Sequence, residues 1–181
     1  MSLLHAQGTG FSRPVKAVFV PETGFVVAEI NPSEYGYTHK AVRYQERIFY
    51  PKDELHITVV SGQSAETVRK HLEKQPQDTE RIQEVVDQTD WSFRQLEEFY
   101  CVVDGEAETI IQMVEMPFLS QFYSDLSGIT GSGHILLPTH VTLYMRGTET
   151  GIGLPNQTAF DTLVKARIRR IELHYEPAGQ D

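Results

Sequence analysis

Short hydrophobic runs broken by turn residues predict most of the strands in this chain. β-Branched and aromatic residues on both sides of a Pro-Glu-Thr-Gly turn predict a hairpin of Val15–Val20 and Phe25–Ile30. The pair Asp104-Gly105 stands between Trp91–Val103 and Thr109–Val114, and an Asp-Gly pair in such a place favours a second hairpin. Further strands are predicted at Glu54–Val60, Leu136–Met145 and Ile168–Tyr175.

Apolar residues three or four positions apart predict helices between these strands. Ser64 is expected to be an N-cap, with Val68 and Leu72 four positions apart behind it. Residues 35–50 are rich in tyrosine and arginine without a clear period, and we expect a loop or short helix there. The order of elements gives two halves, each with a central strand followed by a helix, and predicts an α+β fold. The four predicted helices are Ser64–Leu72, Asp78–Asp87, Pro117–Leu126 and Gln157–Ala166.

The composition is that of one globular domain over residues 1–181. Hydrophobic residues make up 40% and charged residues 23% of the sequence, so the chain can form a core and shows no compositional sign of disorder. Its 16 Lys and Arg against 25 Asp and Glu give a formal net charge of −9. This charge disfavours non-specific binding to duplex nucleic acid or anionic lipid, but it is compatible with a small anionic substrate in a local pocket.

The cysteine content and the length of the hydrophobic runs bear on the cellular location. Cys101 is the single cysteine, which excludes an internal disulfide and suits a reducing compartment. The hydrophobic runs are much shorter than the ~20 residues that a membrane-spanning helix needs, and the N-terminus lacks the features of a signal peptide. We therefore expect a cytoplasmic protein that does not associate with membranes.

Two predicted strands contain nearly the same tetrapeptide. These are His56-Ile-Thr-Val59 and His140-Val-Thr-Leu143, whereas composition alone predicts only about 0.03 matches to this pattern by chance. Because alternate residues of a strand point to opposite faces, each histidine should share a face with the threonine two positions on, while the aliphatic residues point the other way. The duplication is therefore the strongest functional signal in the sequence.

Histidine and threonine in this pattern suit the chemistry of a phosphodiester. One histidine can act as the base and the other as the acid near neutral pH, so we expect His56 and His140 to be catalytic. The hydroxyls of Thr58 and Thr142 can donate hydrogen bonds to non-bridging phosphate oxygens. The sequence does not say which histidine is the base. Carboxylates are scattered and no His-x-x-x-His pair occurs, so neither a metal nor another cofactor is expected.

The two motifs resemble those of the two-histidine (2H) phosphoesterases, which include the RNA 2',3'-cyclic phosphodiesterases historically named 2'-5' RNA ligases. Leu55–Val59 and Thr139–Leu143 match the family pattern, except that Thr139 stands at its first hydrophobic position, and the two histidines are 84 positions apart. The resemblance implies a bilobal duplicated fold, with two antiparallel sheets around a central cleft and helices outside. It also implies metal-independent hydrolysis of cyclic or 2',5'-linked nucleotide phosphates.

Two further residues of the second motif strand are candidates for the site. Tyr144 and Arg146 continue the polar face of the second motif strand, so they are candidates for stacking on a base and for holding a phosphate; the alternative is a rim aromatic and a solvated charge. Each motif histidine, taken alone, could be satisfied in a packed sheet. The loop Gly147–Asn156 lacks the third glycine of a dinucleotide-binding loop, which leaves a carbonyl or redox enzyme without support.

The sequence thus predicts a cyclic phosphodiesterase, with a non-catalytic nucleotide or RNA-end binding module of the same fold as the alternative. The expected partner is a nucleotide or a short RNA end, and not duplex nucleic acid or a membrane. A monomer is expected.

Overall fold

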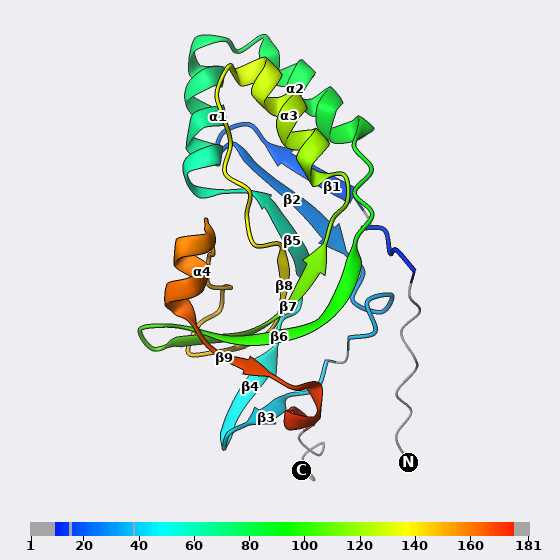
Figure 1. The fold of residues 1–181 in the computed structure, drawn as a ribbon, viewed down its shortest axis with the longest axis vertical. Helices are drawn as coiled ribbons and strands as arrows, with labels where there is room; N and C mark the ends of the chain where they lie inside the picture. The colour runs from blue at the N-terminus through cyan, green and yellow to red at the C-terminus, as the bar shows by residue number, and fades with distance from the viewer. Residues whose placement is uncertain (1–9, 15, 38, 176–181) are drawn as a thin grey trace.

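The computed structural model describes residues 10–14, 16–37 and 39–175 (Figure 1). The described chain is an α+β fold in which ten strands form one sheet, and every described strand pairing is antiparallel. The strands are β1 (Lys16–Val20), β2 (Phe25–Ile30), β3 (Val42–Tyr44), β4 (Arg47–Pro51), β5 (Leu55–Val60), β6 (Arg94–Asp104), β7 (Ala107–Glu115), β8 (His140–Arg146), β9 (Val164–Ile168) and β10 (His174–Tyr175). The helices are α1 (Gly62–Lys74), α2 (Asp78–Gln88), α3 (Leu119–Thr130), α4 (Gln157–Leu163) and the short 3₁₀ helix η1 (Arg170–Glu172).

The two strands that carry the motifs, β5 and β8, are neighbours in this sheet. They pair at Ile57 and Val141. Beyond β5 lie β2 and then β1, and beyond β8 lie β7, β6 and β9. The ribbon of β4, β3 and β10 joins the end of β8 through Tyr50 and Pro51. The two separate sheets expected from the sequence are therefore joined into one, because the motif strands pair with each other.

One order of elements occurs twice along the chain. A hairpin (β1 and β2) pairs with a motif strand (β5) that leads into a helix (α1), and a second hairpin (β6 and β7) pairs with the other motif strand (β8), which precedes α4. The second hairpin is the one predicted from Asp104-Gly105, and Gly105 has the positive φ that such a turn requires. The order places each His-Thr pair at the centre of the sheet.

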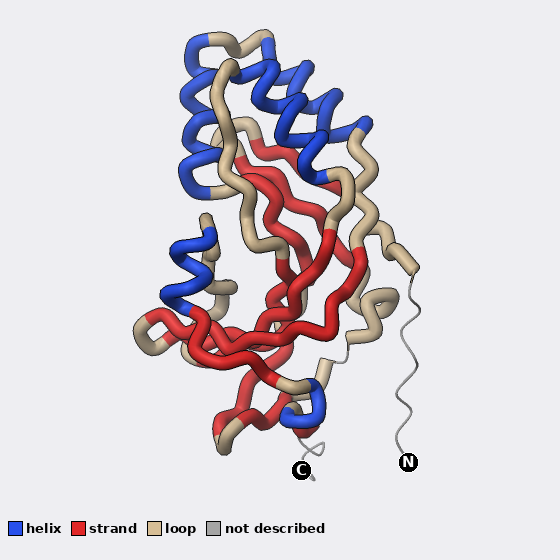
Figure 2. Tube along the Cα trace, in the orientation of Figure 1, coloured by secondary structure: helices blue, strands red, loops and turns tan. Residues whose placement is uncertain are grey.

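The α-helices lie in two places (Figure 1). α1, α2 and α3 lie together at one end of the molecule, and α4 lies apart from them beside β6 and β9 (Figures 1 and 2). Ile82 and Val86 of α2 are four positions apart and both buried, as are Phe122 and Leu126 of α3. This spacing puts the apolar side chains of each helix on one face. None of the helices in the described ranges is both long enough and apolar enough to span a membrane.

The structure corrects several predicted boundaries. α1 begins at Gly62 with Ser61 as its N-cap, so Ser64 lies inside the first turn. Its hydroxyl instead accepts a hydrogen bond from the backbone N–H of Ile135. The described residues between 35 and 50 contain the hairpin β3–β4 and no helix. The predicted helix from Gln157 ends at Leu163 because Val164 begins β9, which pairs with β6.

Smaller differences concern other element ends. The predicted helix from Pro117 begins at Leu119, and the predicted strand from Leu136 begins at His140. The predicted strand Ile168–Tyr175 consists of the end of β9, η1 and β10. Val15, the first residue of the predicted hairpin, lies outside the described residues.

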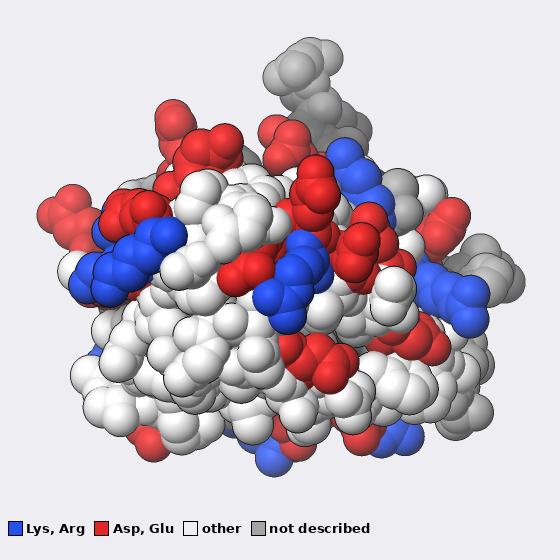
Figure 3. All heavy atoms as spheres, turned by 90° about the horizontal axis from the view of Figure 1, so that it is seen from above, with Lys and Arg blue, Asp and Glu red and all other residues white. Residues whose placement is uncertain are grey.

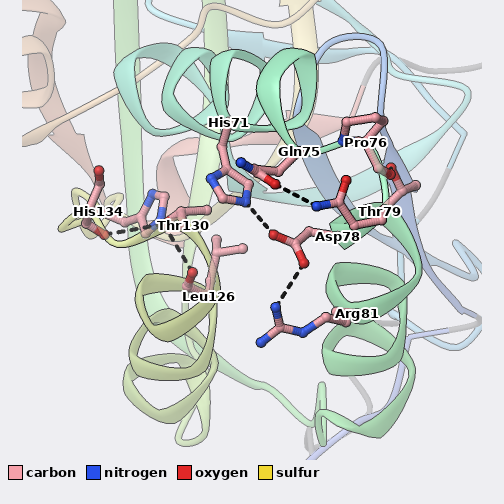
Figure 4. A network of polar contacts seen from close by, with 11 residues as sticks. His71, Gln75, Pro76, Asp78, Thr79, Arg81, Leu126, Thr130 and His134 are labelled. Atoms are coloured by element: carbon pink, nitrogen blue, oxygen red, sulfur yellow. Dashed lines mark hydrogen bonds and ion pairs between the residues drawn. The ribbon is translucent and has the colours of Figure 1, made fainter.

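A polar network joins α1 to α2 (Figure 4). His71 Nε2 lies 2.8 Å from Asp78 Oδ2, and Arg81 donates to Asp78 Oδ1 at 2.8 Å. These hydrogen bonds hold the pKa of the Asp78 carboxyl below its usual value, and the one from His71 has the largest effect. Asp78 is itself buried. The charged carboxylate therefore stabilises the packing of α1 against the start of α2.

Replacing Asp78 by asparagine should lower the melting temperature at pH 7 by a few degrees. Because the folded pKa is lowered, the contribution of the carboxylate is complete above the unfolded value of about 3.9 and is lost as pH falls through the folded value. The difference between wild type and Asp78→Asn should therefore narrow below about pH 4. Thermal unfolding across pH checks this, with the exposed Glu84→Gln on the same helix as the control.

Candidate active site

The four motif side chains line one cleft. His56 and Thr58 come from β5, His140 and Thr142 come from β8, and the cleft has a volume of about 570 Å³. The antiparallel pairing of Ile57 with Val141 places His56 across from Thr142 and Thr58 across from His140. The positive charge that His140 acquires on protonation lowers the pKa of His56, which reflects how close the two rings are. The two His-Thr pairs therefore lie side by side in the sheet and run antiparallel to each other.

Each motif strand has a β-bulge at the same motif position. Val26 and Val27 of β2 are adjacent, but they pair with Val60 and Thr58, so Val59 is an extra residue in β5. On the other side, Ile110 and Ile111 of β7 pair with Tyr144 and Thr142, so Leu143 is an extra residue in β8. A bulge shifts the alternation of side chains by one position. The third residue after each threonine therefore lines the cleft: Ser61 after Thr58, and Met145 after Thr142.

The bulge in β8 corrects the expectation for Tyr144 and Arg146. Simple alternation placed both on the face of Thr142, but neither lines the cleft. Tyr144 is only 4% exposed and its ring packs 5.5 Å from that of Tyr37. Arg146 forms an ion pair with Glu108. The same shift buries Val60, which alternation would place on the face of Thr58.

A tyrosine hydroxyl binds the carbonyl of each bulge residue. Tyr123, from α3, donates to the backbone oxygen of Val59. Tyr37 lies within hydrogen-bond distance of the backbone oxygens of Leu143, at 2.8 Å, and Lys52, at 3.2 Å. The carbonyl of Leu143 also accepts a hydrogen bond from the backbone N–H of Lys52 at 2.9 Å, so the Tyr37 hydroxyl is its second donor. The two tyrosine hydroxyls stabilise the bulges that follow the two His-Thr pairs.

Replacing Tyr123 by phenylalanine should lower the free energy of unfolding by about 1–3 kcal/mol, because the buried carbonyl of Val59 loses its hydroxyl partner. Chemical denaturation measures this change. Tyr50→Phe is the matched control, since Tyr50 is 62% exposed. Equal changes in the two variants would contradict the role of the Tyr123 hydroxyl.

The Nδ1 atoms of the two histidines have different partners. Nδ1 of His140 lies 2.7 Å from the carbonyl oxygen of Pro138. Because a carbonyl can only accept, Nδ1 is the donor, and Nε2 of the neutral His140 ring therefore carries a lone pair. Nδ1 of His56 lies 3.3 Å from Nζ of Lys52, and an ammonium can only donate. The neutral His56 ring therefore carries its proton on Nε2. The site thus presents one accepting and one donating imidazole nitrogen.

Burial and charge favour the neutral form of both rings. Desolvation lowers the pKa of His56, and the charges of Lys52 and His140 lower it further. Desolvation also lowers the pKa of His140, against a smaller opposite effect of its hydrogen bond to Pro138. The neutral form of both histidines is therefore favoured at pH 7.

The two threonines and a loop complete the cleft. Within the described part of the chain, neither the Thr58 nor the Thr142 hydroxyl has a hydrogen-bond partner. The loop after β8 lines the cleft from Glu149 to Leu154, and it is anchored by Ile152 and Leu154, which are buried against β6 and β7. A Cβ on Gly151 would lie 3.1 Å from the Thr142 hydroxyl oxygen. The loop therefore passes close to that hydroxyl.

The charges around the cleft identify a residue that sequence reasoning missed. Lys52 is the one Lys or Arg among the described residues that line it, beside the carboxylates of Asp53, Glu54 and Glu149. Lys52 lies in the turn between β4 and β5, where no periodicity marks it. Lys and Arg charge in the cleft is therefore confined, among the described residues, to one ammonium group.

Over the helical end of the molecule, acidic and basic side chains are interspersed without a continuous basic patch (Figure 3).

The described residues contain no group of three or more His, Cys, Asp or Glu side chains that could hold a metal ion. Comparison with known proteins finds no matching protein-family model, curated protein or solved structure.

Proposed function

We propose that this chain is a phosphodiesterase of the two-histidine phosphoesterase type, acting without a metal on 2',3'-cyclic or related nucleotide and RNA-end phosphodiesters. The observation that carries the proposal is the convergence of His56, Thr58, His140 and Thr142 on one cleft from two paired strands. The repeated order of hairpin, motif strand and helix, and the repeated bulge, support an internal duplication into two lobes.

The tautomers divide the acid and base roles. His140 is the base, because its Nε2 can accept a proton from the attacking water. His56 is the acid, because its Nε2 carries a proton for the leaving oxygen. The water oxygen forms a bond to phosphorus as the bond to one ribose oxygen breaks, and the product is a monoester. Thr58 and Thr142 donate to the non-bridging oxygens as negative charge accumulates on them.

The cleft suits a small substrate with little charge. Its volume of about 570 Å³ is in the range of small-molecule sites. Phe25 lines it and is 38% exposed, so we assign to Phe25 the base stacking for which Tyr144 was a candidate from the sequence. One ammonium among several carboxylates favours a single phosphodiester over a long RNA backbone.

The buried thiol of Cys101 is consistent with action in the reducing cytoplasm.

Incubation with the four nucleoside 2',3'-cyclic phosphates in EDTA tests this function. We expect conversion of at least one of them to a single monophosphate isomer, and chromatography measures this conversion. Failure of the wild type to hydrolyse any of the four would overturn the proposal.

The alternative is a binding module that holds the same ligands without turnover. The two threonine hydroxyls, which have no hydrogen-bond partner among the described residues, would serve such a module equally well. The complementary histidine tautomers would have no role in it. Saturable binding measured by calorimetry, together with no product after long incubation, would favour the module over the enzyme.

A further inference from the structure

Lys52 is held in the cleft by its backbone as well as by its side chain. Its N–H donates to the carbonyl of Leu143 at 2.9 Å, and its own carbonyl is within 3.2 Å of the Tyr37 hydroxyl. Its Nζ donates to the carbonyl of Glu54 at 2.9 Å and contacts Nδ1 of His56 at 3.3 Å. The ammonium is therefore fixed behind His56, on the side opposite the nitrogen that faces a substrate.

This contact restricts how His56 can act as an acid. A charged imidazole carries a proton on both nitrogens, and a proton on Nδ1 would oppose the ammonium of Lys52. A neutral imidazole with its proton on Nε2 fits the contact, but by itself it is a very weak acid. The proton that His56 gives away must therefore be replaced on Nδ1 as it leaves Nε2.

We propose that Lys52 supplies this proton, so that Lys52 and His56 act as a two-step relay. As the bond from phosphorus to the leaving oxygen breaks, Nε2 of His56 passes its proton to that oxygen, and Nζ of Lys52 passes one to Nδ1. The reaction thus converts a charged Lys52 and a neutral His140 into a neutral Lys52 and a charged His140. Solvent then takes the proton from His140 and returns one to Nε2 of His56, while Nδ1 returns its proton to Lys52. The relay rests on the proposed function.

Other charged groups face the pair without replacing Lys52. Glu29 lies across from His56 on β2, Glu54 lies in the same turn as Lys52, and both raise the pKa of His56. His140 from β8 lowers it. Burial lowers the pKa of the Lys52 ammonium below 10.5, which makes it a better proton donor than a lysine in water.

Two substitutions of Lys52 separate proton transfer from charge. Arginine keeps the charge but does not release its proton, so Lys52→Arg should lower kcat by about 100-fold with little change in KM. Lys52→Met should lower kcat similarly and also raise KM. On a His56→Ala background, Lys52→Met should lower kcat no further, because the relay passes through His56. Wild-type kcat in Lys52→Arg would overturn the relay.

The pH dependence gives an independent readout. In the wild type, the alkaline limb of the kcat profile should follow the titration of Lys52, because Lys52 holds the acidic proton, and burial lowers its pKa below 10.5. In Lys52→Met, it should move down toward the histidine value of about 6.5. An unmoved alkaline limb would contradict the relay, whereas absence of turnover in the wild type would overturn the proposed function and the relay with it.

Nitrogen-15 NMR of the histidine rings tests the geometry without activity. Wild-type His56 should be the tautomer with its proton on Nε2, and this preference should weaken in Lys52→Met. His140 should keep its proton on Nδ1 in both proteins, as the internal control. A wild-type His56 with its proton on Nδ1 would contradict the relay even if the enzyme is active.

Discussion

Replacing His56 or His140 by alanine should lower kcat for a nucleoside 2',3'-cyclic phosphate by about 10²- to 10⁴-fold. His140→Ala removes the nitrogen that accepts a proton from water, and His56→Ala removes the one that donates to the leaving oxygen. Steady-state kinetics at saturating substrate measures the loss. Added imidazole should restore part of the rate, because the truncated side chain leaves space in the cleft.

The controls for these substitutions separate chemistry from folding. His174 on β10 is exposed and does not line the cleft, so His174→Ala should leave kcat unchanged. Melting temperatures should show that both cleft variants are folded. Full activity in either folded cleft variant would show that the paired histidines do not perform the acid and base steps.

Replacing Thr58 or Thr142 by valine should lower kcat by about 10²-fold or more, the loss typical when a donor to a developing negative charge is removed. Valine keeps the branched shape and removes only the hydroxyl. Neither hydroxyl has a hydrogen-bond partner among the described residues, so stability should change little. The kinetic effect should therefore greatly exceed the effect on the melting temperature.

Thr109→Val is the matched control for the threonine variants. Thr109 lies on β7, is fully buried, and its hydroxyl has no hydrogen-bond partner within the described residues. The same substitution there removes an unsatisfied polar atom and leaves the cleft intact, so kcat should stay at the wild-type value. Equal loss of kcat at Thr109 and Thr142 would mean that the effect comes from the sheet and not from phosphate binding.

The sequence was most informative where the local pattern and the tertiary structure agree. The hairpin at Asp104-Gly105 combines a turn signature with alternating strand residues, and it forms, with Asp104 as the last residue of β6 and Gly105 in the turn. The hairpin at Gln45 and Glu46 was missed. Both residues have positive φ, and such a turn is normally marked by glycine or asparagine. The residue types at this turn therefore give no sign of the conformation.

The candidate site could be predicted only as far as side-chain alternation holds. His56 and Thr58 share a face, as do His140 and Thr142, because no bulge separates the members of either pair. Tyr144 was misplaced because the bulge at Leu143 has no sequence signature. Lys52 was missed because its position depends on the contact of β4 with β8, which joins residues distant in the sequence.

The most direct test of the account is the phosphorus-31 NMR spectrum of a nucleoside 2',3'-cyclic phosphate mixed with the protein in EDTA. The wild type should convert the signal of the cyclic diester into that of one monoester, with oxygen-18 from labelled water on the new phosphate. The double variant His56→Ala/His140→Ala, confirmed to be folded, should leave the cyclic signal unchanged. A cyclic signal that persists with the wild type, or that disappears equally fast with the double variant, would contradict the account.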